Sequence, residues 1–131
     1  MSIKEEINSL QLPENSFMVV GSSILGVLGL KESDDIDLIV SPAAFKQLID
    51  LGWDQVTEVG GLILKHYPFD VGLYWEEKGL EYWLPRATSI DDTPYLSLVD
   101  LRRWKVERNR PKDPADIKVI DDYLKTRSDA R

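Results

Sequence analysis

Three aspartates stand among apolar residues, and carboxylates placed in this way could bind a divalent cation. Asp35 and Asp37 are separated by one residue, and Asp70 lies between Phe69 and Val71. Residues two apart in a β-strand project from the same face, so the carboxyl groups of Asp35 and Asp37 are predicted to lie together. If Asp70 lies on an adjacent strand, three negative charges repel one another, and a hard cation that prefers oxygen relieves that repulsion. The three aspartates therefore predict a magnesium site.

A short polar turn precedes the aspartate pair and could bind phosphate. Val20 ends an apolar run and is followed by Gly21 and Ser22, before the small apolar stretch 24–30. This order is typical of a strand, a tight turn and a helix. Free N–H groups at a helix N-terminus favour phosphate oxygens, and glycine lets a phosphate approach the backbone closely. Gly21 and Ser22 are therefore candidates for nucleotide binding.

The elements that must position these residues follow from hydrophobic periodicity and turn signals. Strands are predicted at 17–20, 35–40, 55–59, 62–67 and 69–75, with a hairpin turn at Gly60-Gly61. Helices are predicted at 3–12, 24–30, 42–51 and 94–108, and from residue 113 onward. Segment 76–92 shows no clear pattern. The expected fold class is α/β, with helices packed against a short mixed sheet.

Size and composition bound the remaining alternatives. The 131 residues, 43% of them hydrophobic, suit one domain spanning 1–131. Residues at the start lack the apolar segment of a secretory signal, and no apolar run approaches the roughly 20 residues of a membrane helix. A cytoplasmic protein without membrane contact is expected. The net charge of −7 repels polyanions, so nucleic acid would need a local basic patch.

Such a patch lies between residues 102 and 112, where six basic residues accompany Glu107 as the one acid. It could be a solvated helix face, or a strip that contacts a triphosphate or the end of an RNA acceptor.

Each candidate residue also has an ordinary structural interpretation. An aspartate pair can be a solvated strand end, and Gly21-Ser22 can be a turn that binds nothing. Lys105 shares the inward helix face with Leu98 and Leu101, so its amine either extends to solvent or meets an anion. Asp113 precedes a proline and fits helix capping, which we take as its primary role. Strand alternation puts His66, the single histidine, on the face of Asp70, where a surface role is the commoner one.

The two chemical motifs together resemble the nucleotidyltransferase superfamily. Its signature is an apolar residue, Gly, then Gly or Ser, followed after a gap by Asp, apolar, Asp or Glu, apolar. Val20-Gly21-Ser22 and Asp35-Ile36-Asp37-Leu38 match it, and residues 23–34 form a gap of 12 residues that fits the signature. The resemblance implies the minimal nucleotidyltransferase fold and a third carboxylate on a later strand, for which Asp70 is the match.

The C-terminal part resembles the helical tail of the AbiEii-type toxin nucleotidyltransferases and their small bacterial relatives. The similar segments are Leu98 to Lys105 and Arg110 to Ile117. In that family a helix lysine contacts the triphosphate, and a Lys-Asp-x-x-Asp segment borders the site. The resemblance therefore adds Lys105, Asp113 and Asp116 to the candidate nucleotide-binding residues. This chain is far shorter than the larger toxins.

The function expected from these observations is transfer of a nucleoside monophosphate from a nucleoside triphosphate to a hydroxyl of an acceptor, with release of pyrophosphate. Asp35, Asp37 and Asp70 would be the catalytic residues and would hold two magnesium ions. The acceptor could be an RNA or a small molecule, and a homodimer or a protein partner is also open. The alternative is a catalytically silent module of the same fold that binds a partner protein, as antitoxin relatives do.

Overall fold

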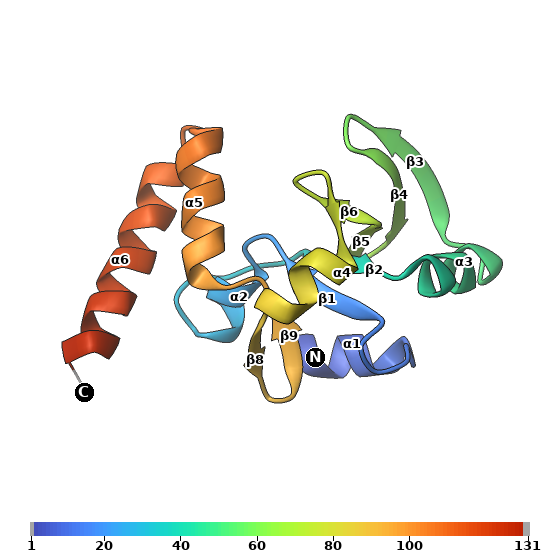
Figure 1. Cartoon of the computed structure of the whole chain (residues 1–131), viewed down its shortest axis with the longest axis horizontal. Coiled ribbons are helices and arrows are strands. Elements are labelled where there is room, and N and C mark those ends of the chain that lie inside the picture. Colours follow the sequence, from blue (N-terminus) through green and yellow to red (C-terminus); the bar gives the residue numbers. More distant parts are fainter. Residues whose placement is uncertain (1, 130–131) are drawn as a thin grey trace. The chain divides into compact units, whose positions relative to one another are not determined.

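The computed structural model describes residues 2–129, which fall into two compact units, Met1–Leu96 and Ser97–Arg131. The first unit contains a mixed sheet with short helices, and the second is a pair of helices (Figure 1). The predicted α/β class with a mixed sheet is confirmed.

The sheet of the first unit has seven strands among the described residues, in the order β3-β4-β5-β2-β1-β9-β8. The strands are β1 (Phe17–Val20), β2 (Ile36–Val40), β3 (Asp54–Glu58), β4 (Gly61–His66), β5 (Phe69–Gly72), β8 (Thr88–Ile90) and β9 (Thr93–Tyr95). At its centre β2 runs antiparallel to β1 and parallel to β5. A second, two-stranded sheet pairs β6 (Tyr74–Trp75) with β7 (Lys78–Gly79).

Central and outer strands differ in burial, and this difference leaves one end of the sheet open. Every residue of β1 and β2 except Phe17 and Asp37 is buried, which explains their continuous apolar runs. All five residues of β3 are exposed. Figure 1 shows β3 and β4 as a long green hairpin that extends from the sheet. Strand β5 therefore joins a buried core to an open hairpin.

Two of the four α-helices described in the first unit begin at serine residues whose side chains cap them. The four helices are α1 (Ile3–Ser9), α2 (Ser23–Val27), α3 (Pro42–Asp50) and α4 (Leu80–Trp83), the last followed by a 3₁₀ turn at Leu84–Arg86. Ser2 and Glu5 form a reciprocal capping box at α1. Ser41 caps α3 by accepting from the Ala44 N–H, and Pro42 occupies the first turn.

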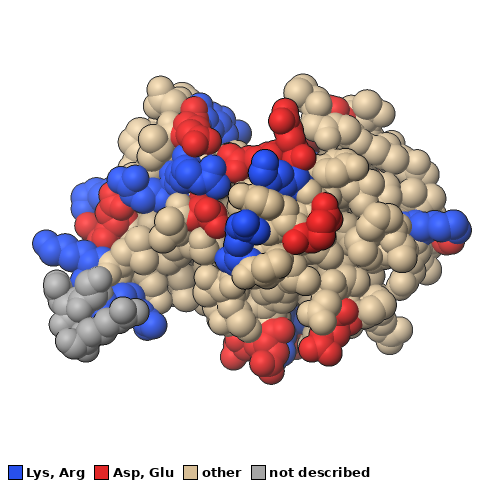
Figure 2. Space-filling model, in the orientation of Figure 1, with Lys and Arg blue, Asp and Glu red and all other residues tan. Residues whose placement is uncertain are grey.

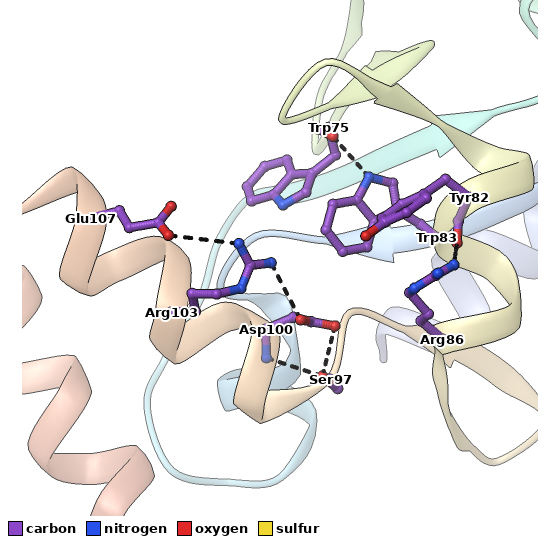
Figure 3. A network of polar contacts seen from close by, with 8 residues as sticks. All are labelled: Trp75, Tyr82, Trp83, Arg86, Ser97, Asp100, Arg103 and Glu107. Atoms are coloured by element: carbon purple, nitrogen blue, oxygen red, sulfur yellow. Dashed lines mark hydrogen bonds and ion pairs between the residues drawn. The ribbon is translucent and has the colours of Figure 1, made fainter.

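Segment 76–92, which showed no sequence pattern, thus contains β7, α4, the 3₁₀ turn and β8. The indole N–H of Trp83 donates to the Trp75 carbonyl at 2.7 Å and ties α4 to β6 (Figure 3).

The second unit is a helical hairpin of α5 (Leu98–Arg108) and α6 (Asp113–Asp129), which lie side by side in Figure 1. Ser97 caps α5 by accepting from the Asp100 N–H at 3.1 Å, and Asn109 ends it in the left-handed region. The prediction that this helix starts at Pro94 was wrong, since α5 begins at Leu98. Residues 93–95 instead form β9, because they pair with β8 along their whole length and with β1 at Tyr95, which is buried.

Candidate functional site

The three predicted aspartates of the first unit come together at one end of β2 and β5. Asp37 on β2 and Asp70 on β5 are direct register partners in a parallel pair. Partners at one register position project from the same face of a sheet. Asp35 immediately precedes β2, and its backbone carbonyl accepts from the Ser23 hydroxyl at 3.1 Å. This contact ties the aspartate pair to the start of α2.

Electrostatics show how closely the carboxylates are placed. Burial, together with the negative charges of Asp70 and Asp35, raises the pKa of Asp37 from 3.8 to about 6. The ammonium of Lys65 opposes the shift. Without a bound cation, Asp37 is therefore mostly ionised at pH 7 and about half protonated near pH 6.

The turn after β1 packs directly against the Asp37 carboxylate. Gly21 has a φ of +69°, and a Cβ at this position would lie 2.7 Å from Asp37 Oδ2. Only glycine accommodates both the backbone angle and this close approach. Ser22 occupies the N-cap position of α2 without a side-chain capping bond. Because α2 has five residues, any phosphate binding here would depend on its N–H groups and little on a helix dipole.

Lys65 is a charged residue of this site that the sequence analysis missed. Strands β4 and β5 are joined by the turn Tyr67-Pro68, and their register pairs Lys65 with Asp70. The Lys65 ammonium lies 3.5 Å from Asp70 Oδ1 and 3.1 Å from Glu58 Oε1. The two-residue turn Tyr67-Pro68 was the sequence signal that could have identified Lys65, because a reversal of the chain there places Lys65 opposite Asp70.

The same turn overturns the expected position of His66. His66 pairs with Phe69, so its side chain lies on the face opposite to Asp70 and stacks on the Trp53 ring at 4.9 Å. Strand alternation does not continue through a turn, which is why counting four residues from Asp70 gave the wrong face.

In the second unit, Lys105 and Asp113 belong to a buried ionic cluster. The Lys105 ammonium lies 2.8 Å from Asp116 Oδ2 and 3.7 Å from Asp113 Oδ1, and its side chain has no exposed surface. Asp113 also accepts from the Arg108 guanidinium at 2.6 Å and from the Arg110 N–H at 2.8 Å. The hydrogen bonds from Arg108 hold the pKa of Asp113 well below its usual range. The predicted contact of Lys105 and Asp113 with nucleotide stays a prediction.

Ion pairs within the helical hairpin also engage the basic segment 102–112. Arg102 contacts Asp121 at 2.6 Å, and Arg103 lies between Asp100 and Glu107 along α5 (Figure 3). Figure 2 shows basic and acidic side chains interspersed over α5 and α6. The excess of positive charge in the linear sequence is thus largely offset by acids of α5 and α6.

The donor set of the first unit has a definite chemical character. Across residues 2–129, no group of three or more His, Asp or Glu side chains is arranged to hold a metal ion unaided. Carboxylate oxygens suit Mg²⁺, which is commonly held by one or two carboxylates together with substrate phosphates and water. Asp37 and Asp70 present carboxylate oxygens of this kind from adjacent positions on one face of the sheet.

Comparison of this chain with protein families, curated proteins and solved structures gives no match. The described helices include none that is long and apolar enough to cross a membrane. The interpretation of the site therefore comes from its own residues and geometry.

Proposed function

We propose that this chain is a metal-dependent nucleotidyltransferase of the minimal nucleotidyltransferase fold. It would transfer a nucleoside monophosphate from a nucleoside triphosphate to a hydroxyl of an acceptor. The observation that carries the proposal is the pairing of Asp37 with Asp70 across parallel strands, with the Gly21 turn against the Asp37 carboxylate. The two parts of the motif that resembles the superfamily, which are separated by 12 residues in the sequence, are therefore adjacent in space.

The proposed reaction is a single displacement at phosphorus. The acceptor hydroxyl oxygen forms a bond to the α-phosphorus, and the bond from that phosphorus to the oxygen bridging to the β-phosphorus breaks. Pyrophosphate leaves with that oxygen, and the hydroxyl proton passes to a carboxylate.

The residues of the site would divide the work between cation and phosphate. Asp35, Asp37 and Asp70 would hold Mg²⁺, and the backbone N–H groups of Gly21 and Ser22 would contact phosphate oxygens. When bound, magnesium neutralises the triphosphate and lowers the pKa of the acceptor hydroxyl. The resemblance implies that these aspartates would hold two ions.

A catalytically silent module that binds a partner protein is the second candidate. It is favoured by the lack, among the described residues, of a carboxylate group arranged to hold a metal unaided. Such a module would keep the fold and the Gly21 turn without binding nucleotide.

Calorimetric titration with nucleoside triphosphates, with and without magnesium, separates the two candidates. We expect the wild type to bind triphosphate only with magnesium, and Asp70→Asn to bind at least about tenfold more weakly, since about 1.4 kcal/mol corresponds to that factor. Asp50→Asn is the matched control, because Asp50 is an exposed aspartate on α3 paired with Lys46. If the wild type binds none of the four common triphosphates, the enzyme proposal is rejected in favour of the silent module.

A further inference from the structure

Lys65 joins three strands of the first-unit sheet at the edge of the carboxylate site. From β4 its ammonium contacts Asp70 on β5 and Glu58 on β3. The side chains of Lys65, Asp70 and Glu58 are 41%, 39% and 48% exposed, so each has room to move. The contact to Glu58 is shorter, at 3.1 Å against 3.5 Å for Asp70. Lys65 is therefore held by one carboxylate outside the proposed metal site and one within it.

A divalent cation at Asp70 would stand close to this ammonium. Like charges at such a separation repel, and at a partly exposed site the repulsion is screened but not removed. The Asp70 oxygen that faces Lys65 is Oδ1, one of the two oxygens with which this carboxylate could bind a cation. Glu58 offers the ammonium a second partner, so leaving Asp70 does not leave it unpaired.

We propose that Lys65 is the built-in counter-ion of the carboxylate site and competes with the divalent cation for Asp70. Without metal, the ammonium neutralises part of the charge of Asp70 and lets the aspartates remain close together. When the cation binds, Lys65 moves onto Glu58. This inference rests on the proposed function, since it assumes that Asp70 is a metal ligand. It predicts that metal alone binds weakly, and that a nucleotide is needed for tight binding.

The test measures binding of Mn²⁺, as a magnetic substitute for Mg²⁺, to the full chain by electron paramagnetic resonance of the free ion. Lys65→Met removes the competing charge and should tighten Mn²⁺ binding by about three- to tenfold. Lys65→Arg keeps the charge and should bind Mn²⁺ as the wild type does. Lys46→Met is the matched control, because Lys46 is an exposed lysine that pairs with Asp50 at 2.9 Å.

A second measurement tests the exchange without relying on tighter binding. In metal-free buffer, the substitution Lys65→Met should cost more stability in the wild-type background than in the Asp70→Asn background. Both backgrounds lose the ion pair with Glu58, but only the wild type also loses the ion pair with Asp70. Saturating Mg²⁺ should abolish that difference. This comparison also shows whether each variant folds.

The outcomes separate failure of this inference from failure of the proposed function. Unchanged or weaker Mn²⁺ binding by Lys65→Met, with binding by the wild type, overturns the competition alone. Weaker triphosphate binding with unchanged Mn²⁺ affinity overturns it as well and makes Lys65 a phosphate ligand. If neither protein binds Mn²⁺ with or without triphosphate, the metal site itself is rejected, and the competition with it.

Discussion

The two units each contain a group of charged side chains, and the groups differ in balance and in exposure. In the second unit, Lys105 and Arg108 face Asp113 and Asp116, two cations against two carboxylates, largely removed from water. In the first unit, several carboxylates gather around Asp37 with Lys65 as the opposing charge. In the buried group of the second unit, each charge is paired with an opposite charge of the same group. The group in the first unit has more carboxylates than cations, and under the proposed function a bound divalent cation would offset this excess of negative charge.

This difference predicts where substitutions affect folding and where they affect binding. The largest effect on stability is expected for Lys105→Met, because it leaves the buried Asp116 carboxylate without its closest cation. Removing one partner of a buried pair costs about 3 to 5 kcal/mol. Denaturant unfolding of the full chain measures this change.

The control for this prediction is Lys118→Met on the same hairpin. Lys118 pairs with Asp122 at 2.6 Å, but both side chains are mostly exposed, so no measurable change in stability is expected. A Lys105→Met protein as stable as the wild type would contradict the structural role of the cluster. Because Lys105→Met is expected to lower the stability of the fold, a test of its effect on triphosphate binding must be made under conditions in which the variant is folded.

Local patterns were sufficient for the central strands and for the aspartate group. The apolar run at 17–20 and the alternation at 35–37 both report burial, and burial is what a sequence pattern encodes most directly. Strand β1 was predicted with its observed bounds, and the alternation correctly placed Ile36 in the core, with the half-buried Asp37 on the other face.

Pairings between distant segments could not be obtained in this way. Lys65 reaches Asp70 only through the register set by the turn at 67–68. Lys105 and Asp116 are eleven residues apart in the sequence, and they meet because the loop after Asn109 reverses the chain so that α6 packs beside α5. Pro94 looks like a helix start, yet pairing of β9 with β8 and β1 decides its conformation. In each case a tertiary contact outweighs a local signal.

The second prediction concerns the glycine that contacts Asp37. Gly21→Ala should destabilise the chain by about 2 to 3 kcal/mol, because it combines left-handed backbone strain of about 1 to 2 kcal/mol with a clash against the carboxylate. It should also displace Asp37 and weaken magnesium-dependent nucleotide binding. Thermal unfolding and calorimetric titration measure the two effects.

Gly29→Ala isolates the backbone component of that effect. Gly29 has a φ of +73°, close to that of Gly21, but a Cβ there meets nothing within 4 Å. The Gly29→Ala variant should lose only the about 1 to 2 kcal/mol of stability that the backbone strain costs, and its nucleotide binding should be unchanged. Equal losses in the two variants would show that the contact between Gly21 and Asp37 has no energetic consequence.

The smallest expected effect is a pH-dependent one at Asp37. Its pKa is raised from 3.8 to about 6 on folding, so between these values the folded chain binds more protons than the unfolded chain. The free energy of unfolding contributed by Asp37 therefore falls as pH rises from about 4 to 6 and is constant above. Asp37→Asn removes this loss and should be more stable than the wild type by roughly 1 to 2 kcal/mol above pH 6. This is less than the about 3 kcal/mol that the full shift corresponds to, because solvent screens this partly exposed carboxyl group, and the difference should vanish near pH 4.

The direction of this difference separates a binding site from a structural one. If Asp37 were ion-paired for stability, as Asp113 is, its substitution would destabilise the chain at neutral pH. An excess of negative charge predicts the reverse, and it also predicts that magnesium with a triphosphate stabilises the wild type more than Asp37→Asn. Urea unfolding of both proteins from pH 4 to 8, with Asp50→Asn as the exposed control, decides between them. A variant less stable than the wild type throughout would place Asp37 in the same class as the balanced cluster of the second unit.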